Sequence, residues 1–348
     1  MKVCFVLESA YTAFSDSNKI GGAEIQIKNF AERLGEERFR VYILTNQAQR
    51  IENIESREIG GNFFQRLGRI YQALKEVGPD LVITTIASKT TVLTSVVCKI
   101  LGIKHVYRLA HDIESEGKTD RETGGPVFKR LLFRFMLAHL TEEIICQHSG
   151  QRDNLVRDNI KTEKVIIHNS FPIRDVPKIK KENCILWVGR FVKWKNPGIV
   201  LDLAERLPDK NFVMISPGIT EDFKKMGEEY NNLKIIDYVP FEDMWEYFER
   251  AKLFINTSDA EGFPNTFIQA AMCKTPIVSL NVDPENLFEK HGHGFVCHSL
   301  DRMEKKIDEL YKNDDLYEKC QKNAIGYAKR IHDIDKNVKT LVEMANNL

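Results

Sequence analysis

The chain has 348 residues, of which 43% are hydrophobic and 29% are charged, and its 50 basic residues balance its 50 acidic residues. A chain of this length exceeds the usual size of one hydrophobic core, so we expect two domains of about 170 residues each. The balanced charge leaves no basic excess of the kind that binds nucleic acid, so we expect no nucleic-acid partner.

The seven cysteines occur singly, with no C-x-x-C pair among them. This spacing argues against a zinc site and against a disulfide framework. Reduced thiols are typical of a cytoplasmic protein, which is the compartment we expect. No stretch reaches the roughly 18 consecutive apolar residues of a spanning helix, so any contact with a membrane would be peripheral, at its inner face.

Short apolar runs alternate with amphipathic stretches along the whole chain. This alternation is typical of βαβ units and of parallel sheets covered by helices on both faces, so we predict an α/β fold of two Rossmann-like domains whose sheets face an interdomain cleft. In the first domain, strands are predicted at residues 3–7, 41–45, 81–86, 105–109, 143–146 and 165–168, and helices at 23–34, 64–76, 90–101 and 127–140. In the second, strands are predicted at 184–189, 212–215, 233–237, 253–256 and 277–280, and helices at 197–207, 241–250 and 264–272.

The domain boundaries follow from a break in this pattern. Residues 171–183 contain two prolines and show neither the 2-residue hydrophobic period of a strand nor the 3.6-residue period of a helix. We therefore predict a linker there, between domains 1–170 and 184–332. A last helix, 333–348, is expected to pack back on the first domain. Asp333-Ile334-Asp335 matches the D-x-D of metal-dependent transferases, but aspartate is a favoured helix cap, so we predict a cap and no metal site.

The first predicted strand leads into a loop that ends Gly21-Gly22-Ala23-Glu24 and opens a helix. Glycines let backbone N–H groups approach a ligand closely, and a helix N-terminus favours an anion. A flexible turn explains the glycine pair equally well. The G-x-G-x-x-G fingerprint of dinucleotide-binding enzymes is absent.

His111 and Asp112 directly follow the strand predicted at 105–109, and therefore lie at its carboxyl end, where open α/β sheets bind ligands. A histidine there can donate to a hydroxyl or to a leaving oxygen, and Asp112 can fix its tautomer or bind hydroxyls itself. A structural histidine is the alternative.

Arg190, Lys193 and Lys195 follow the first strand of the second domain. Arginine offers a bidentate fork and lysine a point charge, which together suit the two phosphates of a nucleotide diphosphate. The alternative is a set of solvated loop cations.

The segment from Glu261 to Gln269 is the most informative. Glu261 falls in a loop after a strand, and Pro264 begins a helix near its first position, where proline is tolerated. This arrangement directs the amides of Asn265 and Thr266 at a phosphate, while Glu261 and Gln269 can bond sugar hydroxyls. Alternatively, Glu261 binds no ligand and only stabilises the helix N-terminus by its negative charge.

Taken together, Gly21-Gly22-Ala23-Glu24, His111, Gly189-Arg190 with Lys195, and Glu261-Gly262-Phe263-Pro264-Asn265 resemble the GT4-type retaining glycosyltransferases of the GT-B fold. The resemblance extends from the first strand to the loop at Asp283-Pro284. The segment around Glu261 is its most specific part.

The resemblance implies a role for each matching residue. Arg190 and Lys195 would neutralise the donor diphosphate in place of a metal ion, so neither a metal nor another cofactor is expected. Glu261 would hold hydroxyls of the transferred sugar, and His111 would lie near that sugar. The other residues implied in donor binding are Gly22, Gly262, Phe263, Pro264, Asn265, Thr266 and Gln269.

The chain departs from the family pattern at two positions. Gln269 stands where the family has a second glutamate, although a neutral amide can still bond ribose hydroxyls. Asn196 stands where the family usually has glycine after the phosphate lysine. Asparagine tolerates the left-handed conformation better than most residues, so this change is expected to be mild.

The activity implied is retaining transfer of a hexosyl or N-acetylhexosaminyl group from a nucleotide sugar, UDP ahead of GDP, to a glycan or lipid-linked acceptor in the synthesis of cell-surface polysaccharide or glycoconjugates. Two alternatives remain open. One is a sugar-nucleotide epimerase or a phosphorylase of the same fold, and the other is a catalytically silent sugar-nucleotide-binding protein, for which Gln269 is the best support.

Residues 128–139 are strongly apolar with basic residues to one side. An interfacial helix has this composition and would suit a lipid-linked acceptor. A core helix of the first domain explains most of the same residues.

Overall fold

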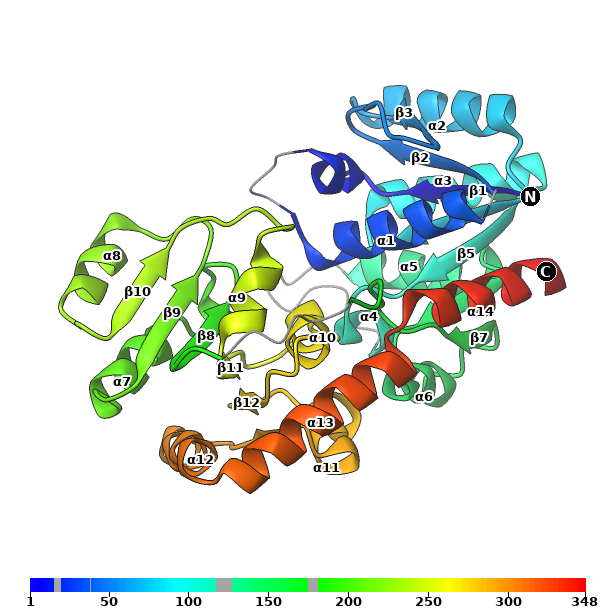
Figure 1. Cartoon of the computed structure of the whole chain (residues 1–348). Helices are drawn as coiled ribbons and strands as arrows, with labels where there is room; N and C mark the ends of the chain where they lie inside the picture. The colour runs from blue at the N-terminus through cyan, green and yellow to red at the C-terminus, as the bar shows by residue number, and fades with distance from the viewer. Residues whose placement is uncertain (16–19, 38, 117–126, 175–180) are drawn as a thin grey trace. The chain divides into compact units, whose positions relative to one another are not determined.

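The computed structural model describes residues 1–15, 20–37, 39–116, 127–174 and 181–348. The chain divides into two compact units (Figure 1). Unit 1 comprises Met1–Pro172 together with Asp333–Leu348, and unit 2 comprises Ile173–His332.

Unit 1 is built on a seven-stranded sheet in the order β3-β2-β1-β4-β5-β6-β7, and every described pair is parallel. The strands are β1 (Lys2–Val6), β2 (Arg40–Thr45), β3 (Ile54–Glu58), β4 (Leu81–Thr85), β5 (Lys104–Arg108), β6 (Glu143–Cys146) and β7 (Glu163–Ile166). The helices are η1 (Ala10–Phe14), α1 (Gly22–Glu36), α2 (Phe63–Val77), α3 (Lys89–Leu101), α4 (Asp112–Ser115), α5 (Val127–His139), α6 (Ser149–Arg157) and α14 (Ile334–Asn347).

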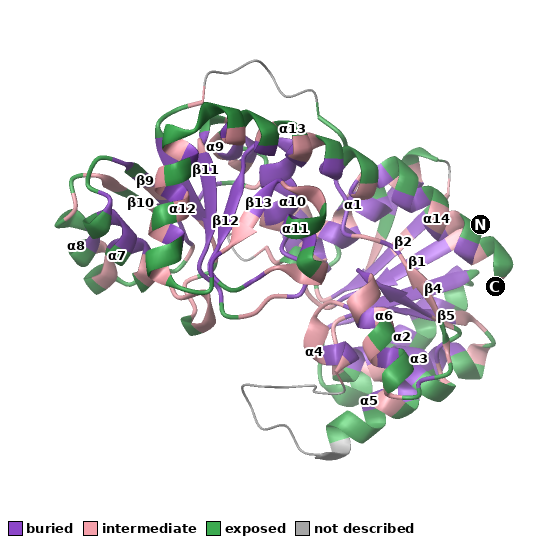
Figure 2. Cartoon of the chain, turned by 90° about the horizontal axis from the view of Figure 1, so that it is seen from below, coloured by how far each residue is buried: buried purple, intermediate pink, exposed green. Residues whose placement is uncertain are grey.

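Helices cover both faces of this sheet, which is why its central strands β1 and β4 are buried along nearly their whole length. On one face, α1 and α14 pack together over Phe5 and Ile83 through residues such as Ile27 and Val338. On the other, α2 and α3 cover Cys4 and its neighbours. Figure 2 shows the buried residues concentrated in the strands and on the inner sides of the helices.

Unit 2 is built on a six-stranded parallel sheet in the order β10-β9-β8-β11-β12-β13. The strands are β8 (Cys184–Val188), β9 (Asn211–Ile215), β10 (Leu233–Ile236), β11 (Leu253–Asn256), β12 (Ile277–Ser279) and β13 (Gly294–Val296). The helices are η2 (Lys193–Lys195), α7 (Gly198–Arg206), α8 (Glu221–Glu228), α9 (Met244–Arg250), α10 (Asn265–Met272), η3 (Pro284–Asn286), α11 (Leu287–His291), α12 (Leu300–Lys312) and α13 (Asp314–Ile331).

The first strand of each unit lies in the middle of its sheet. β1 pairs with β2 and β4, and β8 pairs with β9 and β11. The chain therefore winds outward in both directions from these strands, and the loops on the two sides diverge at their carboxyl ends. In open α/β sheets this switch point is where ligands bind.

The α/β class and the two parallel sheets are confirmed, and the differences from the sequence prediction are local. β3 and β13 were not predicted. Ile86, predicted as the end of a strand, lies beyond β4 with a φ of 62°. Pro264 is the N-cap of α10 rather than its first helical residue. Asp333 caps α14, as predicted, because its side chain accepts a hydrogen bond from the backbone N–H of Asp335.

The segment predicted as a linker is described only in part, since residues 175–180 lie outside the described ranges. At its start, Phe171 forms a parallel bridge to Asp333 within unit 1. At its end, Lys181 Nζ donates to the backbone oxygen of Cys273 (2.9 Å) and to Thr275 Oγ1 (2.7 Å) within unit 2. Burial lowers the pKa of this lysine to about 8.

Candidate active site

The carboxyl ends of β8 and β11 in unit 2 hold an ion pair between two of the predicted site residues. Lys195 Nζ bonds Glu261 Oε1, and Ser258 Oγ donates to the same oxygen at 2.7 Å. The side chains of Lys195 and Glu261 are only 18% and 13% exposed. Such partial burial strengthens the attraction relative to a surface pair.

The turn that carries Lys195 is fixed to the loop after β11 by side-chain hydrogen bonds. Asn196 Nδ2 donates to the backbone oxygen of Thr257 (3.1 Å) and to Asp259 Oδ1 (2.8 Å), and Thr257 Oγ1 donates to the backbone oxygen of Lys195 (2.6 Å). Asn196 itself has a φ of 48°, the left-handed conformation that asparagine was expected to tolerate. The position of Lys195 is therefore set by two loops at once.

Arg190 lies at the exposed start of the loop after β8. Its guanidinium has no ion pair or side-chain hydrogen bond to the described residues, in contrast to the paired Lys195. Two cations thus flank this strand end, and one of them has all its N–H donors available to a ligand.

Helix α10 begins beside this pair. Pro264 is its N-cap, and the half-buried Asn265 and Thr266 form its first turn, where the helix carries a partial positive charge. Gln269 is buried on the same helix, at 4% exposure, and its Nε2 has no hydrogen-bond partner among the residues that the structure describes. A buried amide without a partner is costly, and at this position it marks a group that a ligand can satisfy.

Phe263 anchors the segment between Glu261 and α10. Its ring is buried and lies against the ring of His332, with centroids 4.9 Å apart. His332 Nε2 in turn lies 2.7 Å from Tyr327 Oη, and the Tyr327 ring stacks on the fully buried His293. Burial lowers the pKa of His293 to about 3, so this histidine is neutral and serves packing.

In unit 1, His111 caps the short helix α4. Its Nδ1 accepts a hydrogen bond from the backbone N–H of Ile113 at 3.3 Å. In the neutral ring the proton is then assigned to Nε2, which can donate to a hydroxyl.

Asp112 does not orient His111, contrary to one of the two predictions made for it. Its Oδ1 lies 2.8 Å from His148 Nε2 and accepts from Gln151 Nε2 at 2.9 Å. Burial alone would raise the pKa of Asp112, but the hydrogen bonds from His148 and Gln151, together with the charges of His148 and His111, hold that pKa below its usual value.

His148 and Gln151 were missed by the sequence analysis, although the signal that singled out His111 was available for them. They follow β6 at its carboxyl end as His111 follows β5. Glu114 ties the neighbouring loops together by accepting from the backbone N–H groups of Ala87 (3.1 Å) and Ala110 (2.8 Å). Burial raises the pKa of Glu114.

The glycine pair opens α1 after β1. Gly21 is the N-cap and Gly22 is exposed. The Glu24 carboxylate folds back so closely that a Cβ at residue 21 would collide with it, and Ser9 Oγ donates to Glu24 at 2.5 Å. A side chain at residue 21 would therefore have to displace the Glu24 carboxylate.

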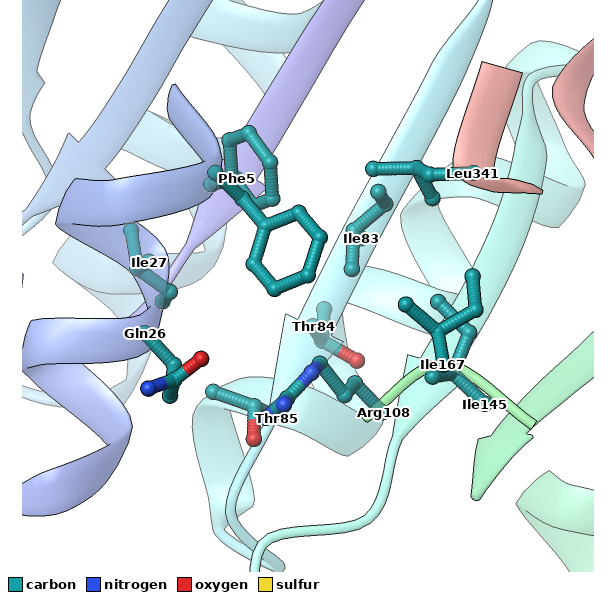
Figure 3. Close-up of a pocket in the computed structure, with 11 residues that line it drawn as sticks. Phe5, Gln26, Ile27, Ile83, Thr84, Thr85, Arg108, Ile145, Ile167 and Leu341 are labelled. Atoms are coloured by element: carbon teal, nitrogen blue, oxygen red, sulfur yellow. The ribbon is translucent and has the colours of Figure 1, made fainter. Parts of the chain in front are cut away.

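A cavity in unit 1 lies under α1 and contains none of the predicted site residues (Figure 3). It is lined mainly by apolar core side chains, with Arg108 and Thr85 at one side. Arg108 Nη2 donates to Asn169 Oδ1 at 2.5 Å, and burial lowers its pKa to about 10. This cavity belongs to the core.

The structure therefore gathers Lys195, Glu261, Arg190 and the start of α10 at one edge of unit 2, and places Gly22 and His111 at the carboxyl edge of unit 1. Among the described residues, no three His, Cys, Asp or Glu side chains come together as metal ligands. No helix in the described ranges is long and apolar enough to cross a membrane.

Solved structures share this architecture. A sucrose-phosphate synthase from Thermosynechococcus elongatus superposes with a TM-score of 0.82 over 99% of this chain and 98% of its own, at 12% identity. Anabaena HepE in complex with UDP-glucose gives 0.81 over the whole of both chains at 16% identity. The fold is GT-B, that of glycosyltransferases.

Relatives in sequence name the same class. A glycosyltransferase of Methanocaldococcus jannaschii is 23% identical over 89% of this chain and 90% of its own length. A poly(ribitol-phosphate) alpha-N-acetylglucosaminyltransferase of Staphylococcus aureus is 27% identical over 43% of this chain and 33% of its own. Residues 170–327 match the family model of glycosyl transferases group 1. These comparisons identify the protein as a glycosyltransferase.

Proposed function

We propose that this enzyme transfers a hexosyl or N-acetylhexosaminyl group, with retention, from a nucleotide-diphosphate sugar to a hydroxyl of a glycan or lipid-linked acceptor. The observation that carries the proposal is the Lys195–Glu261 pair at the β8 and β11 ends, beside the unpaired Arg190. Unit 2 binds the donor, and unit 1 binds the acceptor.

The charges in unit 2 suit a diphosphate. Arg190 and Lys195 neutralise it without a metal ion, and the backbone from Gly262 to Thr266, which leads into the N-terminus of α10, adds partial positive charge. Glu261 has one oxygen held by Lys195 and Ser258, and the other accepts hydrogen bonds from hydroxyls of the transferred sugar. Gln269 bonds the ribose.

The transfer itself exchanges one bond for another on the same face of the sugar. The bond between the anomeric carbon and the diphosphate oxygen breaks, and the bond to the acceptor oxygen forms. The departing phosphate oxygen accepts the proton of the incoming hydroxyl. His111 donates from Nε2 to a hydroxyl of the transferred sugar, and Gly22 presents its backbone to the diphosphate or the acceptor.

Neighbouring proteins support the choice of donor and process. HepE has been crystallised with UDP and UDP-glucose, and two relatives are named as N-acetylglucosaminyltransferases of Staphylococcus aureus and Niallia circulans. CapH of Staphylococcus aureus is named for capsular polysaccharide biosynthesis. We accordingly propose UDP rather than GDP as the nucleotide of the donor, and cell-surface polysaccharide or glycoconjugate as the product.

A peripheral contact with the inner face of a membrane is part of the proposal. Helix α5 buries Phe133, Met136 and Leu137 in the core of unit 1, so the core interpretation holds for three of the seven apolar residues of this helix whose burial is described. Leu131 and Phe135 are instead 58% and 52% exposed. The exposed basic residues Lys129 and Arg130 adjoin them, as in an interfacial helix.

Thermal-shift screening against UDP, GDP, ADP and their common sugars tests donor binding, because a ligand stabilises the state it binds. Radiolabel transfer from the stabilising donor, with and without acceptors, tests the reaction. Turnover that needs no acceptor would indicate an epimerase, and binding without turnover would indicate a silent protein. Unchanged transfer by Glu261→Ala would refute the mechanism.

A further inference from the structure

A chain of buried side chains leads from the sheet of unit 2 to the carboxylate of Glu261. Ser279 Oγ on β12 donates to Asn256 Oδ1 on β11 at 3.5 Å, and Asn256 Nδ2 donates to Ser258 Oγ at 3.3 Å. Ser258 Oγ then donates to Glu261 Oε1 at 2.7 Å. Ser258, Asn256 and Ser279 are at most 5% exposed.

The loop that carries Glu261 has no regular structure of its own to fix this side chain. It lies between the end of β11 and the N-cap of α10, and Gly262 follows it directly. Two side chains, Lys195 and Ser258, hold the carboxylate, both at Oε1. The position of Oε2 is therefore set by these two contacts.

The two contacts differ in what else their side chains do. Lys195 reaches the carboxylate from a separate turn and is one of the two cations assigned to the diphosphate, so its bond to Glu261 competes with its bond to the donor. Ser258 is fixed on the loop itself, since its N–H donates to Asn256 Oδ1 at 3.2 Å and its Oγ accepts from Asn256 Nδ2. Its hydroxyl proton is thereby directed at Glu261.

We propose that Ser258 is the residue that positions Glu261 for the sugar of the donor, with Asn256 as its anchor. This inference rests on the proposed function, in which Glu261 binds sugar hydroxyls. It predicts that Ser258 affects recognition of the sugar and leaves recognition of the nucleotide diphosphate unchanged. Loss of a hydrogen bond to a charged group corresponds to roughly a 10-fold to 100-fold change in affinity.

The test compares dissociation constants for UDP and UDP-GlcNAc by isothermal titration calorimetry in the full chain. For Ser258→Ala we expect the constant for UDP to stay within about twofold and the constant for UDP-GlcNAc to rise about tenfold or more. Glu261→Ala should change the ratio of the two constants in the same direction. Ser258→Cys, which keeps a weak S–H donor, should fall between wild type and Ser258→Ala.

Ser216→Ala is the matched control, because Ser216 is an equally buried serine of unit 2 whose hydroxyl has no hydrogen-bond partner in the described part of the chain. It should leave the ratio unchanged. If Glu261→Ala changes the ratio and Ser258→Ala does not, the inference is wrong while the proposed function stands. If Glu261→Ala leaves the ratio unchanged, or wild type binds neither probe, the donor assignment itself is wrong. A purely structural role for Ser258 would weaken both ligands equally.

Discussion

His148 Nε2 lies 2.8 Å from Asp112 Oδ1, which joins the loops that follow β5 and β6 at the carboxyl edge of unit 1. Gln151 donates to the same carboxylate oxygen, so Oδ1 is committed to α6 and its N-cap. The second oxygen has no partner among the described side chains. The Asp112 carboxylate, next to His111, is thus held through Oδ1, and its Oδ2 is left to accept a hydrogen bond from a ligand.

The stability that Asp112 contributes should depend on pH. Its pKa is below the usual value in the folded state, so the contribution is complete above about pH 4 and is lost as pH falls through the folded-state pKa. Asp112→Asn removes the charge and should lower the melting temperature at pH 7 by roughly 2–4 °C, on the order of 1 kcal/mol. Thermal melts of both proteins from pH 7 to pH 3 measure this.

The difference between wild type and Asp112→Asn should narrow as the pH drops below 4, because the wild-type carboxyl then becomes neutral as well. Asp153→Asn is the control, since Asp153 is an exposed residue of α6 that pairs with its neighbour Arg152. A difference between wild type and Asp112→Asn that stays constant with pH would show that the charge of Asp112 does not stabilise this edge.

Arg190 should contribute to donor affinity without contributing to stability. It is exposed and has no partner among the described residues, so Arg190→Ala should leave the melting temperature unchanged. If it bonds the diphosphate, its loss should weaken UDP binding by roughly 10-fold to 100-fold, as expected for charge-assisted hydrogen bonds. Lys193→Ala removes an exposed cation three residues away and should have little effect on UDP. Equal losses of UDP affinity in the two variants would indicate that positive charge in this loop attracts UDP in general, without a specific bond from Arg190.

Gln269 can be tested by restoring the charge that the family pattern has at this position. Its Nε2 is buried and has no partner within the described ranges, so replacing the amide by a carboxylate removes an unsatisfied donor and adds a charged acceptor for ribose hydroxyls. Gln269→Glu should therefore bind UDP several-fold more tightly, at roughly 1 kcal/mol. Gln269→Leu, which has neither group, should bind less tightly than wild type. Identical affinity in all three proteins would exclude contact between residue 269 and the nucleotide.

The sequence was informative about which residues follow the buried strands. The apolar runs that became β5, β8 and β11 located His111, Arg190 and Glu261 on the correct loops. β3 escaped prediction because it is an edge strand of mostly polar residues, with Ile54 its only buried side chain. β3 is held as a strand by its backbone hydrogen bonds to β2, and such pairing between separate segments leaves no signal in the sequence of β3 itself.

Side-chain partners were harder to predict, because they join residues far apart in the chain. Asp112 and His148 are 36 positions apart, and Lys195 and Glu261 are 66 apart. The left-handed backbone of Ile86 is a second example, since a β-branched residue disfavours that conformation and only the surrounding structure can impose it.

The exposed apolar face of α5 gives the last prediction. Leu131 and Phe135 are exposed beside Lys129 and Arg130, so we expect the protein to float with vesicles of phosphatidylglycerol and phosphatidylcholine and to bind phosphatidylcholine alone less well. The double variant Leu131→Ser, Phe135→Ser should stay in the soluble fraction and no longer float with the vesicles. Its melting temperature should not change, because the core side of α5 is intact. Phe64→Ser, on α2, removes an even more exposed aromatic ring (81%) away from α5 and should still float.

Flotation lost equally in both variants would mean that exposed apolar area in general, and not α5, drives binding. A wild-type protein that stays wholly soluble would contradict the membrane contact. Salt should weaken the interaction if Lys129 and Arg130 take part, since screening reduces their attraction to anionic lipid.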